Sequence, residues 1–74
     1  MDEIIEILEE INPDPDYRTA ENLMDGEILD SFCILAIISE LEDTFDIDIP
    51  TAEIKPANFN SARAIYEMVK RLQG

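Results

Sequence analysis

One dipeptide in this sequence has the residue types and the position for chemistry on a hydroxyl group. Asp30 and Ser31 stand directly before an apolar run that extends to Phe45. Both residue types are favoured N-caps, so the sequence predicts a helix that begins here. The first backbone N–H groups of a helix are free and carry the positive end of its dipole, which suits an anion. A phosphate ester on the Ser31 hydroxyl would therefore be well placed.

The same dipeptide has a simpler interpretation, in which Ser31 only caps the helix. Serine and aspartate are common caps in helices that carry no modification. The dipeptide alone does not distinguish the two interpretations, so the rest of the chain has to decide between them.

The pattern of the predicted helix places Ser31 at the surface. The solvent side is expected to hold Phe32, Ala36 and Asp43, with Leu35 near its edge. Ser31 would then be an exposed hydroxyl beside apolar and acidic surface residues. The core-facing stripe recurs at helical spacing and consists of Ile34, Ile37, Ile38, Leu41 and Phe45.

The net charge of −13 is the strongest feature of the composition. It argues against binding nucleic acid or an anionic membrane, since both would repel the chain. It favours basic protein partners, which the acidic surface would attract. Between Arg18 and Lys55 the chain has no cation and ten acidic residues. Ser31 thus lies in the most one-signed part of the sequence, although a plain solubilising face would have the same composition.

The residue types make catalysis by this chain improbable. The chain has no histidine, which is the usual general base and the commonest metal ligand near neutral pH. It has no glycine-rich phosphate loop, and the single Cys33 cannot form an intrachain disulfide or a thiolate metal cluster. Cys33 could have a redox or thioester role, but a small apolar filler is the simpler interpretation.

One metal-binding pattern has to be considered and is rejected. Asn12, Asp14 and Asp16 resemble the first ligands of a calcium-binding helix-loop-helix. Tyr17 stands where that loop requires glycine, and Leu23 stands where it requires a bidentate glutamate. We therefore expect no metal site.

With 74 residues, the chain is expected to be a single domain, residues 1–74, with a small core. Its acidic first residues do not form a signal peptide, and its longest uncharged run is too short to span a bilayer, so we expect a cytoplasmic monomer. The first helix is predicted over Asp2 to Ile11, because Asn12-Pro13 ends it. A long loop follows, in which Tyr17, Leu23, Met24, Ile28 and Leu29 are expected to contact the core.

After the central helix the sequence predicts shorter elements and one more long helix. Asp46 to Pro50 is read as an extended connector with Ile47 or Ile49 turned inward. Thr51 is expected to cap a short helical turn that ends at Ile54, and Pro56 to Phe59 is predicted to be a loop. Asn60 or Ser61 is expected to cap the last helix, with Ala62, Ile65, Val69 and Leu72 inward. The predicted fold is all-α, a small four-helix bundle of three main helices and one short helix, with a long first loop.

Three stretches stand in a recognisable order along the chain: Leu29-Asp30-Ser31-Phe32, Phe45-Asp46-Ile47-Asp48-Ile49-Pro50 and Asn58-Phe59-Asn60-Ser61, with Ile65 after them. Together with the length and the acidity, this order resembles the acyl carrier and peptidyl carrier proteins over nearly the whole chain. The approach Gly-Glu-Ile-Leu-Asp-Ser is more similar to D-alanyl and other stand-alone aminoacyl carriers. Fatty-acid-type carriers usually have glycine where Ile28 stands.

The resemblance implies a carrier function and not an enzyme. A phosphopantetheinyl transferase would attach 4'-phosphopantetheine from coenzyme A to Ser31, with Asp30 as the conserved acid before it. The arm would hold an acyl or aminoacyl group as a thioester for partner enzymes of lipid, cell-wall or secondary-metabolite biosynthesis, including a loading ligase and downstream transferases. The surface expected to meet these partners consists of Phe32, Leu35, Ala36, Glu40 and Asp43.

The alternative is a non-enzymatic acidic adaptor. In that case the exposed Phe32 and Leu35 would bind a basic groove of another protein, and Ser31 would be only a helix cap. Loading of the arm onto the chain would separate the two hypotheses.

Overall fold

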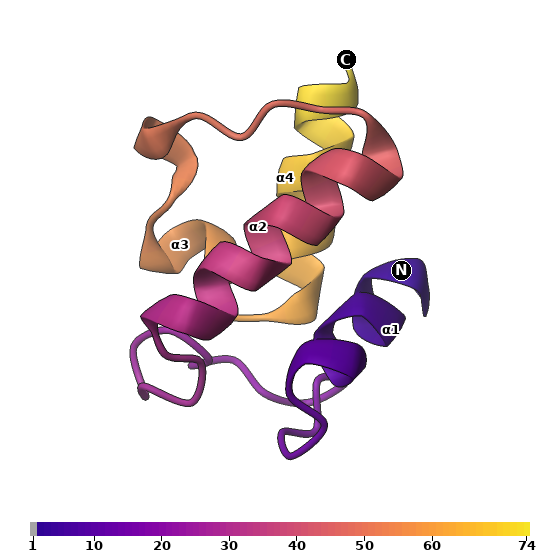
Figure 1. Ribbon diagram of the computed structural model, residues 1–74. Helices are drawn as coiled ribbons and strands as arrows, with labels where there is room; N and C mark the ends of the chain where they lie inside the picture. The colour runs from indigo at the N-terminus through magenta and orange to yellow at the C-terminus, as the bar shows by residue number, and fades with distance from the viewer. Residues whose placement is uncertain (1) are drawn as a thin grey trace.

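A computed structural model describes residues 2–74, and the described part of the chain is helical without strands. The three long helices are α1 (Asp2–Ile11), α2 (Ser31–Phe45) and α4 (Ala62–Gln73). Two short elements lie between α2 and α4, namely the 3-10 turn η1 (Thr51–Glu53) and the helix α3 (Pro56–Phe59). The predicted all-α bundle with a long first loop is confirmed (Figure 1).

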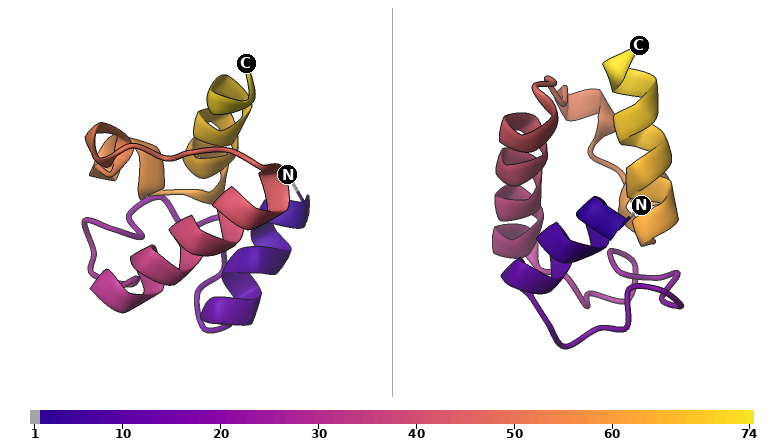
Figure 2. Two further views of the ribbon diagram at one scale, coloured as in Figure 1. Left: turned by 45° about the horizontal axis from the view of Figure 1, so that its top comes forward. Right: turned by 90° about the vertical axis from the view of Figure 1, so that its right-hand side faces the viewer.

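The long helices pack around one core. α1 contacts both α2 and α4, and α3 contacts α4. The right-hand view of Figure 2 shows α2 and α4 on opposite sides, with α1 lying across the space between them. The arrangement brings the apolar stripe of each helix to the same interior, as amphipathic helices require.

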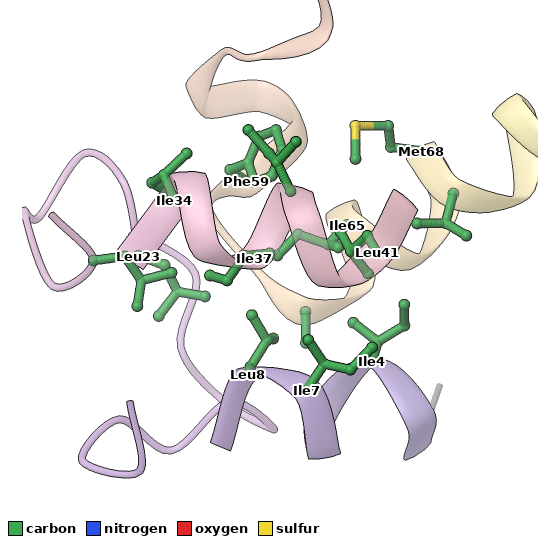
Figure 3. Close-up of a cluster of buried hydrophobic side chains, with 14 of the residues drawn as sticks. Ile4, Ile7, Leu8, Leu23, Ile34, Ile37, Leu41, Phe59, Ile65 and Met68 are labelled. Atoms are coloured by element: carbon green, nitrogen blue, oxygen red, sulfur yellow. The ribbon is translucent and has the colours of Figure 1, made fainter. Parts of the chain in front are cut away.

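The core side chains come from all three long helices and from the loops (Figure 3). The α2 stripe is confirmed for four of its five residues, while Phe45 is only half-buried. In α1 the buried apolar residues are Ile4, Ile5, Ile7 and Leu8, while Ile11 is half-buried. The largest fully enclosed side chains are Phe59, Ile4, Leu8, Leu23, Ile37, Leu41, Ile65, Met68 and Val69.

The first connection, residues 12–30, contacts the core through fewer residues than predicted. Tyr17, Leu23 and Leu29 are buried, as expected, and Met24 is half-buried. The prediction for Ile28 is wrong, since its side chain is 38% exposed. Leu29 takes the inward position next to it, at the end of a turn that the hydrogen bond from the Leu29 N–H to the Leu23 carbonyl closes.

The second connection, residues 46–61, differs from the prediction in two places. Pro56–Phe59, predicted to be a loop, forms the helix α3. Proline at the first position suits a helix start, because its missing N–H has no partner there in any helix. Thr51 does not cap the short turn; it is the first residue of η1, after Pro50. The connector 46–50 contains no helix or strand, with Ile49 buried and Ile47 half-buried, as expected. Its first residue, Asp46, is not extended, because it ends α2 with a left-handed φ of 53°.

Serine caps α4, whereas aspartate caps α2. The Ser61 side chain accepts a hydrogen bond from the Ala64 N–H at 3.0 Å. At α2 the cap is Asp30, whose Oδ1 accepts from the Cys33 N–H at 2.9 Å. Of the two caps expected for α4, Ser61 and not Asn60 is the N-cap. In α2 the N-cap is Asp30, so Ser31 is the first helical residue. None of the helices within residues 2–74 has the length and apolarity needed to cross a bilayer.

Candidate functional site

The start of α2 separates the capping group from the candidate reactive group. Asp30 has extended backbone geometry and caps the first turn with its carboxylate, while its carbonyl oxygen accepts from the Ile34 N–H at 3.0 Å. The hydrogen bond from the Cys33 N–H is the main reason why the pKa of the Asp30 carboxyl is lowered. The interpretation of Ser31 as the cap is therefore wrong, because Asp30 already does this.

The hydroxyl of Ser31 lies on the surface. Its residue is exposed, and no hydrogen bond of the hydroxyl is found within residues 2–74. The backbone N–H groups of Ser31 and Phe32 belong to the first turn, where a helix offers no carbonyl partner. The site therefore combines a free hydroxyl with the positive end of a helix dipole.

An open groove of about 630 Å³ lies beside this hydroxyl. One wall comes from the first connection, one from the first turns of α2, and Ile54 closes the third side after η1. The lining is mainly apolar, so it would accept a flexible organic chain more readily than a bare ion. The residues that line the groove are Met24, Glu27, Leu29, Asp30, Ser31, Ile34, Leu35 and Ile54.

The predicted partner residues all lie on the outer surface of α2. Phe32 is 84% exposed and Leu35 is 62% exposed, which is unusual for large apolar side chains. Ala36, Glu40 and Asp43 are also exposed. Their spacing of three or four residues places them on one side of the helix.

Cys33 lies in the first turn of α2, where it is half-buried against the core, and it does not resemble a reactive thiol. Burial is the main reason why its pKa is raised, and the neighbouring Asp30 carboxylate adds to the effect. A thiol with a raised pKa is protonated at neutral pH and is a poor nucleophile. The geometry favours the interpretation of Cys33 as a small apolar filler.

Several groove residues were not predicted from the sequence. Met24, Glu27 and Leu29 belong to an irregular loop, and Ile54 comes from a segment more than twenty positions after Ser31. Ile28 was assigned to the core and is instead partly exposed. A loop has no periodicity from which such neighbours could be found, so only the fold shows them.

The loop that resembled a calcium site uses its side chains internally. Asn12 Oδ1 accepts from the Asp14 N–H at 3.2 Å, and Asp16 Oδ1 accepts from the Arg18 N–H at 3.2 Å. Tyr17 donates its hydroxyl proton to the Asn12 carbonyl at 2.5 Å. Over residues 2–74 no three histidine, cysteine or acidic side chains converge so as to hold a metal ion.

Curated proteins give matches over almost the whole chain. A D-alanyl carrier protein of Streptococcus sanguinis is 39% identical over 72 residues, which cover 96% of this chain and 91% of the relative. D-alanyl carrier proteins of Streptococcus gordonii and Streptococcus thermophilus are each 38% identical with the same coverage. No protein-family model and no solved structure matches the chain.

The relatives are named as carriers and not as enzymes, so the expectation of a carrier without catalytic activity is confirmed. The similarity includes the region around Ser31, since only a few residues lie outside the matched 72. By its sequence over nearly its full length, the chain belongs to the D-alanyl carrier protein family.

Proposed function

We propose that this protein carries D-alanine as a thioester on a 4'-phosphopantetheine arm attached to Ser31. The observation that carries the proposal is the exposed Ser31 hydroxyl, which is free because Asp30 caps the helix in its place. The printed names of the relatives support D-alanine as the cargo. Among the lipid, cell-wall and secondary-metabolite pathways named above, the relatives' names favour cell-wall biosynthesis over the fatty-acid branch of lipid biosynthesis.

The residues at the site fit such an arm. A phosphodiester on Ser31 would meet the N–H groups of the first turn and the positive end of the α2 dipole. The mainly apolar groove beside Ser31 offers contacts to the organic part of an arm. When attached, the group supplies a terminal thiol on which an aminoacyl group is held as a thioester.

The chain supplies the nucleophile of the attachment reaction but no base for it. Ser31 Oγ would form the new bond to phosphorus and displace the adenosine bisphosphate part of coenzyme A. The carboxylate of the preceding residue, Asp30, already accepts a hydrogen bond from the Cys33 N–H, and this bond lowers its pKa. A carboxylate with a lowered pKa is a weak base, so the proton of Ser31 has to go to a base of the transferase.

The outer face of α2 fits basic partner enzymes. Exposed Phe32, Leu35 and Ala36 offer apolar contact, and Glu40 and Asp43 add negative charge toward the end of the same face. An apolar centre with a charged rim is a common arrangement at binding surfaces. The proposed partners are a phosphopantetheinyl transferase, a loading ligase and downstream transferases. Since the arm derives from coenzyme A, we place the protein in the cytoplasm.

The proposal is tested by incubating the purified chain with coenzyme A, Mg²⁺ and a broad-specificity phosphopantetheinyl transferase, then measuring the intact mass. We expect one arm on the wild-type chain and none on Ser31→Ala. Ser39→Ala is the matched control, because Ser39 is also exposed on α2 but lies two turns further along. This variant should be loaded as the wild type is.

The cargo is tested on the loaded chain with a D-alanine-activating ligase and its nucleotide. D-alanine should add to the arm, whereas L-alanine should add much more slowly. If the wild-type chain takes no arm from a transferase that is active on another carrier, the carrier proposal is wrong and the adaptor alternative becomes the better one.

A further inference from the structure

One residue at the far end of the second connection holds the loop that leads to Ser31, through its backbone carbonyl and its side chain. Asn60 follows α3, and its carbonyl oxygen accepts from the Leu23 N–H at 2.9 Å. Its Oδ1 accepts from the Met24 N–H at 3.1 Å and from the Asp25 N–H at 2.9 Å. Its Nδ2 donates to Asp25 Oδ2 at 3.0 Å. Four hydrogen bonds thus join residues that are at least 35 positions apart in the sequence.

The loop that Asn60 holds is closed by its own backbone and leads directly to the site. The Glu27 N–H donates to the Met24 carbonyl at 3.1 Å, and the Leu29 N–H donates to the Leu23 carbonyl at 2.9 Å. Leu23 donates its N–H to the Asn60 backbone carbonyl and accepts the Leu29 N–H at its own carbonyl. Leu29 lies two residues before Ser31, so these two hydrogen bonds connect Asn60 to the start of α2. Met24, Glu27 and Leu29 also form one wall of the groove.

This loop has a backbone conformation that needs external support. Glu27 has a φ of 57°, a left-handed geometry that residues other than glycine rarely adopt. At Gly26 a Cβ would lie 2.7 Å from the carbonyl oxygen of Asn22, so only glycine allows this close approach. Strained loops persist only where neighbouring structure fixes them, and Asn60 provides much of that fixation here.

Asn60 is itself held firmly. It directly follows Phe59, whose side chain is completely buried in the core (Figure 3). The Asn60 N–H donates to the Pro56 carbonyl at 2.9 Å, which completes the turn of α3. The side chain therefore extends from a fixed backbone to an irregular loop outside the helices.

We propose that Asn60 is a positioning residue for the loading of Ser31: it keeps residues 23–29 in the conformation in which the transferase meets the groove and the hydroxyl. This proposal rests on the proposed function. Without the Asn60 side chain, only a fraction of the molecules has the competent loop at any time. The apparent affinity for the transferase falls by that fraction, whereas the chemical step in the bound complex is unchanged.

The experiment compares the kinetics of arm attachment for the wild type and Asn60→Ala, well below the melting temperature of both. We expect KM for the carrier to rise about threefold to tenfold in Asn60→Ala, with kcat nearly unchanged. Ser61→Ala is the matched control, because it removes the neighbouring hydrogen bond that caps α4 and leaves all four hydrogen bonds of Asn60 to the loop in place. Its melting temperature should fall, while its KM should stay at the wild-type value.

A second pair of variants exchanges the two partners. Asn60→Asp places a carboxylate against Asp25 and should raise KM at least as much as Asn60→Ala. The double variant Asn60→Asp/Asp25→Asn restores an amide opposite a carboxylate, with an oxygen still facing the Met24 and Asp25-position N–H groups. It should regain most of the wild-type KM, and a role limited to global stability would not give this recovery.

Amide hydrogen exchange gives a readout independent of loading. In Asn60→Ala the N–H groups of Met24 and residue 25 should exchange faster, whereas those in the middle of α2 and α4 should not change. Wild-type KM in Asn60→Ala, or a rise in KM equal to that of Ser61→Ala, would overturn the inference while wild-type loading still supports the carrier function. Absence of loading in the wild type would instead contradict the proposed function itself.

Discussion

The two long connections on either side of α2 are held in different ways. In the first, residues 22–29 are fixed by Asn60, and three of its four hydrogen bonds there come from neutral backbone N–H groups. In the second, the ordering groups are carboxylates. Glu42 Oε2 accepts from the Ile49 N–H at 2.9 Å, and Glu53 accepts two hydrogen bonds from Arg71 at 2.9 and 3.0 Å.

The difference shows where the protein can tolerate changes of charge. The connection that carries the site is fastened by amides, so its shape depends little on pH or salt near neutrality. The second connection, which contributes Ile54 to the groove, is fastened by the Glu53–Arg71 ion pair and by charged hydrogen bonds, which salt and acid weaken. A surface that attracts charged partners can thus keep its geometry while its surroundings vary.

Both connections depend on the core residue Phe59. Among the substitutions that test this comparison, Phe59→Ala should reduce the free energy of unfolding most. Its side chain is buried in the core. Its sequence neighbours are Asn58, which donates a hydrogen bond to Glu53 within the second connection, and Asn60, which accepts one from Met24 in the first. We expect Phe59→Ala to lower the free energy of unfolding by about 3–5 kcal/mol, since a large buried side chain is lost. Urea denaturation followed by circular dichroism measures this.

The control for this prediction is the exposed phenylalanine. Phe32 is 84% exposed, so Phe32→Ala should change the free energy of unfolding by less than about 0.5 kcal/mol. Equal destabilisation by the two variants would contradict the description of Phe59 as a core residue and Phe32 as a surface residue.

Glu53 should make the second connection sensitive to acid. Hydrogen bonds from Arg71 are the main reason why the pKa of Glu53 is lowered. Because the folded-state pKa lies below the unfolded value, the stabilisation is present above the unfolded value and is lost as pH falls through the folded one. Glu53→Gln should therefore lower the melting temperature at pH 7, and the difference from wild type should shrink in acid.

A second glutamate serves as the control for the acid experiment. Glu67 pairs with Arg63 at 3.7 Å on the exposed side of α4, where solvent screens the interaction. Glu67→Gln should leave the melting temperature almost unchanged at both pH values. If both variants behave alike, the Glu53 network does not hold the second connection.

Tyr17 should make the first connection sensitive to alkali. Of the predicted effects on stability, that of removing its hydroxyl at neutral pH should be the smallest. Burial is the main reason why its pKa is raised to about 12, and the nearby Cys33, Glu9 and Asp14 add to it. The stabilisation from its protonated hydroxyl is fully present below the unfolded value near 10 and is lost as pH rises toward 12.

Tyr17→Phe removes the hydrogen bond to Asn12 and should cost about 0.5–1.5 kcal/mol at pH 7. Thermal melts between pH 8 and about 11.5 should show a smaller alkaline loss for this variant than for wild type. Tyr66→Phe leaves Tyr17 in place and should keep the full loss. An alkaline profile of Tyr17→Phe identical to wild type would show that the Tyr17 hydroxyl does not titrate as described.

The long helices and the exposure of Ser31 could be predicted from the sequence because their signals are local. The spacing from Ile34 to Leu41 predicts a helix whatever the rest of the chain does, and Asp30-Ser31 marks its start. Pro56–Phe59 was predicted wrongly because four residues are too few to show a helical period. Thr51 was predicted to be a cap by its residue type, whereas the backbone places it inside the turn.

The groove and its support could not be predicted, since they depend on contacts between distant segments. Nothing in the sequence around Asn60 indicates that its amide meets Met24 and Asp25. Likewise, Ile28 and Leu29 are equally apolar, and only the fold decides that Leu29 faces inward while Ile28 is partly exposed. The sequence therefore predicts the position of the hydroxyl well and its surroundings poorly.

The most direct test of the central claim is to locate the arm on the loaded chain. Cleavage after glutamate should release the peptide of residues 28–40, which contains both Ser31 and Ser39. Fragmentation of this peptide should place the added mass on Ser31, in the fragments that lack Ser39. An arm on Ser39 or Cys33, or an unmodified peptide after incubation with an active transferase, would contradict the account.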